Sequence, residues 1–175
     1  MTNFITDPFI HLKNRGLDNA GKTTVIKRLN GEDIDAVAPT LGFKISTFTF
    51  QPYTLNIWDV GGQKSLRSYW KNYFESTDGL VWVVDCADTI KLETCKKELH
   101  DLLKEERLAG ATLLVLANKQ DLANALSGDQ LEELLDLKSI KTHNWALYPV
   151  SAANDQGIME PFEWLVKDIG SRIYA

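Results

Sequence analysis

Three short polar runs hold residue types at spacings that suit phosphate chemistry. The first run, Gly16–Thr23 (GLDNAGKT), fits the phosphate-binding pattern G-x-x-x-x-G-K-[ST]. Glycines allow such a loop to aim backbone N–H groups inward, its lysine bridges the β- and γ-phosphates, and its hydroxyl binds Mg²⁺. A chance glycine-rich turn before a helix is the competing interpretation of this run taken alone. The predicted nucleotide contacts are Asp18, Asn19, Ala20, Gly21, Lys22, Thr23 and Thr24, of which Thr24 is more simply explained as a helix residue.

The second run, Asp59–Gln63 (DVGGQ), supplies groups for a metal ion and an attacking water. Asp59 ends a predicted strand, where a carboxylate can hold Mg²⁺ through water. The N–H of Gly62 can meet a terminal phosphate, and Gln63 can orient a water, which makes Gln63 the predicted catalytic residue. Thr40 lies in a loop and can reach Mg²⁺ only when a γ-phosphate is present, as in a nucleotide switch. The plain alternatives are a turn-forming role for Asp59, a solvated position in the first turn of the next helix for Gln63, and a strand-entry position for Thr40. The predicted metal ligands are therefore Thr23, Thr40 and Asp59.

The third run, Asn118–Asp121 (NKQD), follows an apolar stretch, at the strand end where α/β sheets bind ligands. The carboxylate of Asp121 accepts two hydrogen bonds, and guanine offers N1–H and N2–H₂ as adjacent donors, whereas adenine offers no such pair. A polar strand-end loop is the alternative for this run alone. The predicted base contacts are Asn118, Lys119 and Asp121, with Ser151 and Ala152 bringing a backbone N–H to a purine oxygen. Together the runs predict a guanine-nucleotide switch, and an ATPase is a distant alternative.

The elements that must position these runs alternate between apolar stretches and amphipathic helices, which predicts an α/β fold of βαβ units. The fold class is therefore a mostly parallel central sheet with helices on both faces, built around a phosphate loop. Residues 43–50 and 53–58 form a predicted hairpin. Further strands are predicted at 80–84, 111–117 and 145–150, and helices at 23–29, 91–106, 127–135 and 158–173. Ser127 is the predicted cap of the third helix, with Asp129 and Gln130 in its first turn. Residues 16–175 are expected to form one domain.

Composition narrows the function further. The chain has 175 residues, 44% hydrophobic and 25% charged, with a net charge of -5, so no nucleic-acid-binding footprint is visible. Its two cysteines, Cys86 and Cys95, form no disulfide or metal pattern, which fits a reduced, cytoplasmic setting. No apolar run is long enough to span a bilayer. Residue 2 is Thr2 rather than glycine, so no myristoyl anchor is expected.

The segment before the phosphate loop departs from the expected pattern. Only Phe9–Leu12 is apolar, and Lys13, Asn14 and Arg15 separate it from the loop. Burying two unpaired charges in a central strand would cost several kcal/mol each. Residues 1–15 are therefore expected to be atypical, with Pro8 interrupting any helix there. Two alternatives stay open: a short strand over residues 9–12 with a lengthened approach to the loop, or a variant start that lacks the strand.

The motifs resemble those of the ADP-ribosylation-factor (Arf) family, nearest its Arf-like branch linked to tubulin-folding cofactors. The resemblance covers residues 16 to about 174, which is most of the chain. It is carried by the segments Gly16–Thr24, Pro39–Phe43, Trp58–Gln63, Lys64–Gly79 and Glu105–Thr112.

This resemblance implies the small-GTPase fold, GTP and GDP as ligands with Mg²⁺, and family roles for the residues named above. It also implies that Phe43, Trp58 and Tyr73 form an aromatic effector surface, and that the 43–58 hairpin slides between nucleotide states. The implied partners are a tubulin-folding cofactor, a small effector named binder of Arf-like two, immunoglobulin-like carriers of lipidated proteins and a GTPase-activating protein. A cytoskeletal or mitochondrial location comes from the family likeness alone.

Two functional classes stay open at this point. The first is a switch that cycles between GDP and GTP with slow hydrolysis, because no arginine in the chain is an evident catalytic finger. The second is an interaction protein that keeps the aromatic surface but binds nucleotide weakly or not at all. The complete phosphate loop, Gln63 and Asp121 favour the first class. Residues 13–15 favour the second.

Overall fold

The computed structural model describes residues 9–17, 19–34, 43–50, 52–60 and 77–173. Within them lies a sheet of six strands in the order β2-β3-β1-β4-β5-β6. Only β2 and β3 are antiparallel, as the hairpin prediction required, and all other pairs are parallel. The strands are β1 Phe9–Gly16, β2 Phe43–Phe50, β3 Tyr53–Val60, β4 Gly79–Asp85, β5 Thr112–Asn118 and β6 Trp145–Pro149. The predicted fold class, a mostly parallel α/β sheet, is confirmed.

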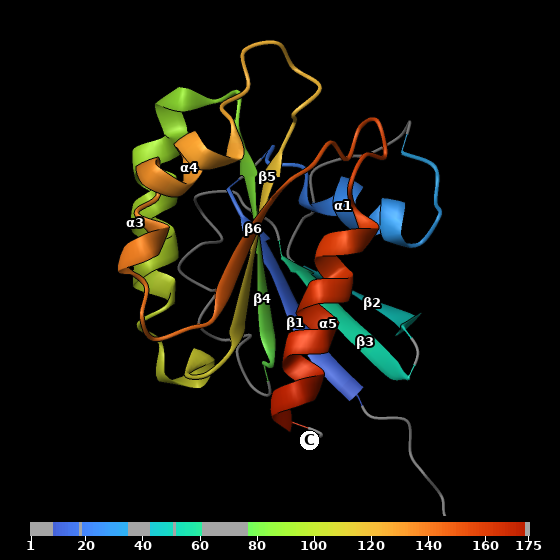
Figure 1. Ribbon diagram of the computed structural model, residues 1–175. Coiled ribbons are helices and arrows are strands. Elements are labelled where there is room, and N and C mark those ends of the chain that lie inside the picture. The colour runs from blue at the N-terminus through green and yellow to red at the C-terminus, as the bar shows by residue number, and fades with distance from the viewer. Residues whose placement is uncertain (1–8, 18, 35–42, 51, 61–76, 174–175) are drawn as a thin grey trace, which may run out of the picture.

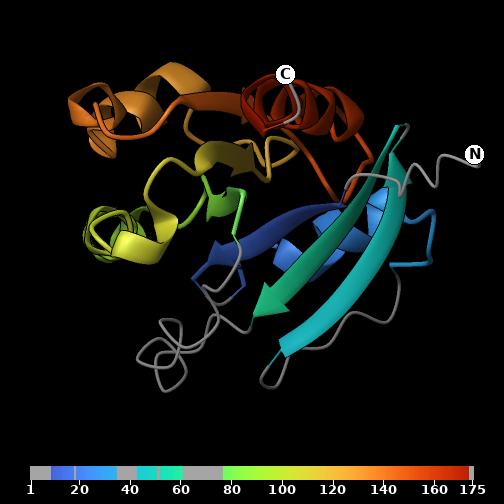
Figure 2. The same cartoon turned by 90° about the horizontal axis from the view of Figure 1, so that it is seen from below.

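Helices cover both faces of the sheet, as Figure 1 shows from the front and Figure 2 from below. The helices α3 Leu92–Leu102 and α4 Gly128–Leu134 pack on one face, against apolar side chains of β4 and β5 such as Trp82. The helices α1 Lys22–Leu29 and α5 Met159–Ile173 pack on the other face. Alternation along β4 divides its side chains between the two cores, because successive residues of a strand point to opposite faces. Short 3-10 turns lie at Thr89–Lys91, Glu106–Leu108 and Leu137–Ser139.

The first strand is complete, and this corrects both alternatives drawn from the sequence. β1 runs from Phe9 to Gly16 and lies between β3 and β4, with Lys13 opposite Trp58 on one side and Leu80 on the other. It therefore passes directly into the phosphate loop, without a lengthened approach. Parallel pairing on both sides supplies the backbone hydrogen bonds that the local sequence pattern did not predict.

Three consecutive polar residues of β1, Lys13, Asn14 and Arg15, are buried. Lys13 is 2% exposed and Arg15 is fully buried. The Lys13 ammonium lies 3.7 Å from the ring centroid of Trp58, an arrangement that attracts a cation to the ring face. Burial, with a smaller contribution from the charge of Arg15, lowers the pKa of Lys13 to about 8. Nη1 of Arg15 donates to the Asn14 carbonyl oxygen at 3.3 Å.

Two helix boundaries show where local patterns succeed and fail. Ser127 caps α4 as predicted: its hydroxyl accepts from the N–H of Gln130, whose side chain accepts in return from the N–H of Ser127. The single helix predicted over 91–106 is wrong, because α3 ends at Leu102. Glu105 adopts an extended backbone (φ -66°, ψ 128°), which brings Leu108 back into the core, where it is fully buried.

Among the described residues, no helix combines the length and the apolar character that crossing a membrane requires.

Candidate functional site

The phosphate loop joins β1 to α1, and its glycines are required by close contacts. Gly16 has φ +151°, and a Cβ there would lie 2.3 Å from the carbonyl oxygen of Val83. Gly21 has φ +100°, and a Cβ there would lie 2.3 Å from the side-chain nitrogen of Asn118. Asn19 also adopts a left-handed backbone (φ 62°), which asparagine tolerates better than most residues. The loop therefore packs against Val83 of β4 and Asn118 at the end of β5, and neither contact leaves room for a side chain at Gly16 or Gly21.

Lys22 and Thr23 open α1 and lie where the motif requires them. Nζ of Lys22 donates to the carbonyl oxygen of Leu17 at 2.7 Å, so the side chain folds back across the loop. The positive end of α1 adds to the attraction for an anion at this position. Thr24 is a half-buried residue of the first helical turn, and no contact with it distinguishes a ligand from a helix residue.

Thr23 and Asp59 bring a hydroxyl and a carboxylate together from two elements. The hydroxyl of Thr23 donates to Oδ2 of Asp59 at 2.7 Å, and Asp59 is 1% exposed at the end of β3. Asn14 of β1 supports both segments: its Nδ2 lies 3.0 Å from the Lys22 carbonyl oxygen and 3.4 Å from Oδ1 of Asp59. Mg²⁺ prefers oxygen ligands of this kind, so the donor set fits that ion.

Asn118, at the end of β5, ties the loops of the site to one another. Its Nδ2 donates to the Ala20 carbonyl oxygen at 2.9 Å, and its Oδ1 accepts from the Ala152 N–H at 3.0 Å. Asn118 is 2% exposed, so both hydrogen bonds are shielded from water. The structure therefore brings together the first and third runs, which lie about a hundred residues apart in sequence. The Ala152 N–H, predicted to meet a purine oxygen, would have to be shared between that oxygen and Asn118.

Asp121 and Ser151 meet at the outer wall of the site. The Ser151 hydroxyl donates to Oδ1 of Asp121 at 2.7 Å. Ser151 is buried whereas Asp121 is exposed, so the hydroxyl holds the carboxylate from behind while the acid faces outward. A carboxylate held in this way is oriented for a ligand with two adjacent N–H donors.

Lys119 occupies a strained position beside the base contacts. Its backbone is left-handed (φ 68°), an uncommon conformation for a lysine. Its Nζ lies 2.7 Å from Oδ2 of Asp85, at the end of β4. Strain of this kind persists where the surrounding structure holds a side chain in place. The ion pair holds the Lys119 side chain against the end of β4.

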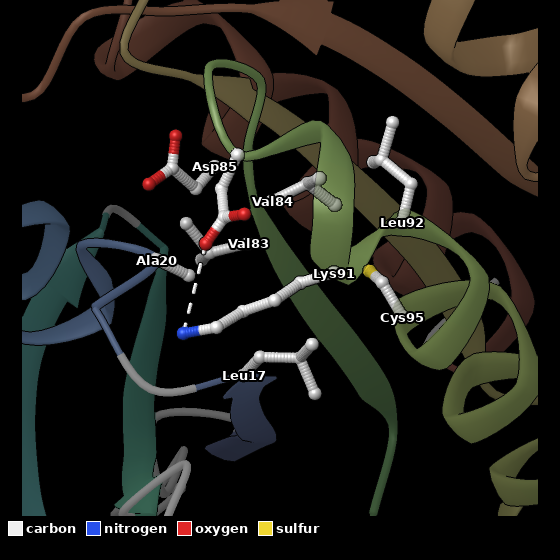
Figure 3. A pocket seen from close by; sticks show the side chains of 9 residues that line it. Leu17, Ala20, Val83, Val84, Asp85, Lys91, Leu92 and Cys95 are labelled. Carbon is white, nitrogen blue, oxygen red and sulfur yellow. Dashed lines mark ion pairs between the residues drawn. The ribbon is translucent and has the colours of Figure 1, made fainter.

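A small pocket lies on the α3 side of the phosphate loop (Figure 3). Leu17 and Ala20 of the loop form one wall, and Cys95 and Leu92 of α3 form another. Lys91 points across it, paired with Asp88 at 3.6 Å. Ala20, a predicted nucleotide contact, and Asp85, the partner of Lys119, line this pocket, so it adjoins the candidate nucleotide site.

Several predicted site residues lie outside the described residues: Asp18, Thr40, Gly62, Gln63 and Tyr73, together with the side chain of Phe43. Their roles stay predictions. Trp58 is described: it is half-buried in β3, against Lys13.

Sequence reasoning missed three residues that the structure places at the site: Asn14, Arg28 and Asp85. Asp85 directly follows the apolar run of β4, and that strand-end position could have identified it. Asn14 and Arg28 gave no local signal, because their partners are distant in sequence.

The sheet order, the phosphate loop after β1 and the position of Asn118 define the small-GTPase fold. The fold is shared with a solved structure described as the Arl6 BBS3 small GTPase from Trypanosoma brucei with bound nucleotide analogue GppNp. That structure matches with a TM-score of 0.86 and 29% identity, covering 93% of this chain and 98% of its own.

The sequence comparisons give the family. The model of the ADP-ribosylation factor family matches residues 10–169. ADP-ribosylation factor-like protein 2 of Drosophila melanogaster is 62% identical over 160 residues, covering 91% of this chain and 87% of the relative. The protein of the same name from Arabidopsis thaliana is 59% identical over 160 residues, with 91% and 86% covered. The chain belongs to the ADP-ribosylation factor family, as its motifs predicted, and members of this family are in general GTP hydrolases.

Proposed function

We propose that this chain is a guanine-nucleotide switch that binds GDP and GTP with Mg²⁺, hydrolyses GTP slowly, and presents its hairpin to effectors in the GTP state. The observation that carries the proposal is the junction at Asn118, which holds the phosphate loop and the Ser151–Ala152 loop in contact. Phosphate and base groups of one ligand then meet a single preformed site.

In this proposal the two ends of the nucleotide are bound by different physical means. The loop N–H groups, Lys22 and the positive end of α1 attract the phosphates. Asp121, held by Ser151, accepts from the guanine N1–H and N2–H₂. Thr23 and Asp59 would hold Mg²⁺, with Thr40 joining when a γ-phosphate is present. When bound, the ion supplies positive charge that neutralises the phosphate oxygens.

The same proposal covers partners and setting. Phe43, Trp58 and Tyr73 would form the effector surface, and Trp58 lies on β3 within the hairpin. We propose as partners a tubulin-folding cofactor, binder of Arf-like two, immunoglobulin-like carriers of lipidated proteins and a GTPase-activating protein, in a cytoplasmic setting. The relationship to the ADP-ribosylation factor-like protein 2 group supports these assignments.

The alternative, an interaction protein that does not cycle nucleotide, rests on the polar residues 13–15 at the position of the first strand. β1 occupies that position, and Asn14 on it contacts both the Lys22 carbonyl and Asp59. These contacts support the cycling protein over the alternative.

Base selectivity tests the proposal directly. Replacing Asp121 with asparagine turns one acceptor into a donor that faces the guanine amino group. We expect Asp121→Asn to weaken labelled-GDP binding at least about 100-fold, because polar groups left unpaired in a binding site are strongly discriminated against. The variant should prefer xanthosine diphosphate, whose carbonyl at position 2 accepts from the new amide.

The matched control is Asp155→Asn, an exposed residue in the turn after Ser151 whose positive φ (53°) asparagine tolerates. It should leave both affinities unchanged. If the wild-type protein folds but ignores GDP, or takes ADP equally well, the proposed function is wrong.

Slow hydrolysis is a separate expectation. Without an arginine finger in cis, the unassisted rate should be on the order of 10⁻³ s⁻¹ or lower, and a GTPase-activating protein should raise it by about 10³-fold or more. Single-turnover hydrolysis of GTP with and without such a protein measures both rates. Turnover within seconds by the isolated chain would contradict this expectation.

A further inference from the structure

Arg28 connects α1 to the loop that carries the base contacts. Its Nε donates to the carbonyl oxygen of Ala152 at 2.7 Å, and its Nη2 donates to the carbonyl oxygen of Ala153. These partners lie 124 and 125 residues further along the chain. Neither the phosphate nor the base motif includes Arg28.

The geometry of the contact between Arg28 and the two carbonyl groups matches that of a guanidinium group. Nε and one Nη of arginine lie on the same edge of a rigid plane and donate two parallel hydrogen bonds. Here they meet two successive carbonyl groups, which fixes the orientation of two peptide planes at once. A positive charge in the last turn of α1 is also favoured by the helix dipole.

The loop gripped by Arg28 in turn orients the base-reading acid. Ser151 directly precedes Ala152, and its hydroxyl donates to Oδ1 of Asp121 at 2.7 Å. The Ala152 N–H is held on the opposite side by Oδ1 of Asn118 at 3.0 Å. Ala152 is thus fixed through its N–H by β5 and through its carbonyl by α1.

α1 carries the phosphate contacts at its other end. Lys22 and Thr23 open the helix, and Arg28 lies six residues after Lys22, about 9 Å along the axis. One rigid helix therefore connects the phosphate contacts to the loop behind Asp121.

We propose that Arg28 is a positioning residue, which holds the loop 151–153 against α1 so that Asp121 is correctly oriented for the guanine amino group. This inference rests on the proposed function, since it concerns the same nucleotide site. It assigns to Arg28 a role in base selectivity and in nucleotide retention, although Arg28 itself need not touch the nucleotide.

The experiment compares Arg28→Ala, Arg28→Lys and Lys27→Ala in the full chain. Lys27 is the neighbouring basic residue in the same helical turn, half-buried like Arg28, and serves as the matched control. Two quantities are measured: the dissociation rate of fluorescent GDP, and the ratio of the affinities for GDP and inosine diphosphate. Inosine lacks the amino group that Asp121 reads, so this ratio reports on the orientation of Asp121.

We expect Arg28→Ala to accelerate GDP release about 10- to 100-fold, because two hydrogen bonds from a charged group are lost. The preference for GDP over inosine diphosphate should shrink at least about threefold, because Asp121 loses its support. Arg28→Lys, with a single point charge, should recover part of both effects. Lys27→Ala should behave as wild type.

A general weakening of the fold would lower both affinities equally and leave their ratio unchanged, so an unchanged ratio in Arg28→Ala overturns the inference. If Arg28→Ala does not fold, the ratio in Arg28→Lys decides in the same way. If the wild-type protein binds no GDP, the proposed function fails first. If the wild type binds GDP and both arginine variants keep its release rate and ratio, only the role of Arg28 is wrong.

Discussion

Asn118→Ala is expected to abolish high-affinity guanine-nucleotide binding and to lower the free energy of unfolding by about 2–5 kcal/mol. The Asn118 side chain is buried, and it is the hydrogen-bond partner of the Ala20 carbonyl and of the Ala152 N–H. Truncation to alanine removes both of these hydrogen bonds at once. A buried polar group that loses its partner costs about 1–3 kcal/mol, and here two such groups are affected.

The loss should be larger for binding than for folding, because the site depends on the relative position of two loops. The Asn118 side chain bonds to both the phosphate loop and the Ser151–Ala152 loop, and its removal takes away this connection between them. A displacement of about 1 Å between phosphate and base contacts is enough to cost about 100-fold in a preorganised site. Urea unfolding without nucleotide, and equilibrium binding of labelled GDP, measure the two effects separately.

The control for this prediction is Asn144→Ala. Asn144 is an exposed asparagine directly before β6, at the opposite end of that strand from Ser151, and its Nδ2 donates to Oδ1 of Asp168. Its truncation should cost about 1 kcal/mol or less and leave GDP affinity unchanged. If Asn118→Ala binds GDP within threefold of the wild type, the side chain does not organise the site.

Whether a structural feature could be predicted from the sequence depends on how far apart in the sequence its stabilising contacts lie. Apolar runs identified β4 and β5, because both faces of these strands are buried and residues 80–84 and 113–117 are all apolar. Ser127 and Gln130 identified the start of α4, because capping is a contact between residues three apart. Local patterns are reliable where the stabilising contact is itself local.

β1 could not be predicted in the same way. Lys13 and Arg15 contradict the pattern of a buried strand, and what accommodates Lys13 is the ring of Trp58, which lies on another strand. The end of α3 has the same explanation, since no Gly or Pro lies between Leu102 and Glu105, and the helix stops so that Leu108 reaches the core. Tertiary packing decides both cases.

The same distinction between local motifs and distant contacts applies to the residues of the candidate site. The three motifs begin at the ends of β1, β3 and β5, and the structure places Lys22 at the start of α1, Asp59 near the end of β3 and Asp121 just after β5. Parallel strands bring their carboxyl ends to one edge of the sheet, and the roles of these residues there stay predictions. The supporting residues Asn14 and Arg28 were missed. Their partners are set by the packing of β1 and α1 rather than by sequence spacing.

Lys13→Met is expected to stabilise the protein at pH 7 by about 1–3 kcal/mol, since replacing a buried charge by an apolar side chain of similar size is often favourable. Lys13 is 2% exposed, and the attraction of its ammonium to the Trp58 ring is worth only about 0.5–2 kcal/mol. Burial lowers the pKa of Lys13 from 10.5 to about 8, so the net environment disfavours the charged form.

The pH dependence identifies the cause of this stabilisation. Below pH 8 the amine is protonated in both the folded and unfolded states, and the folded state bears the full cost of the buried charge. Between about pH 8 and 10.5 the folded protein releases the proton while the unfolded chain keeps it, so wild-type stability rises with pH. The advantage of Lys13→Met should therefore shrink steadily across this window.

Cys86 must be separated from this effect. Burial raises the pKa of its thiol to about 12, against 9.0 in the reference state, so from about pH 9 upward the unfolded thiolate makes unfolding more favourable. That contribution is the same in the wild type and in Lys13→Met, and it cancels in their difference. Urea unfolding of both proteins at several pH values from 7 to 10 gives that difference directly, and Lys44→Met, at an exposed lysine of β2, provides the control for removal of a lysine charge from the sheet. A gap between wild type and Lys13→Met that stays constant from pH 7 to 10 would mean that Lys13 is not buried as a charge in β1.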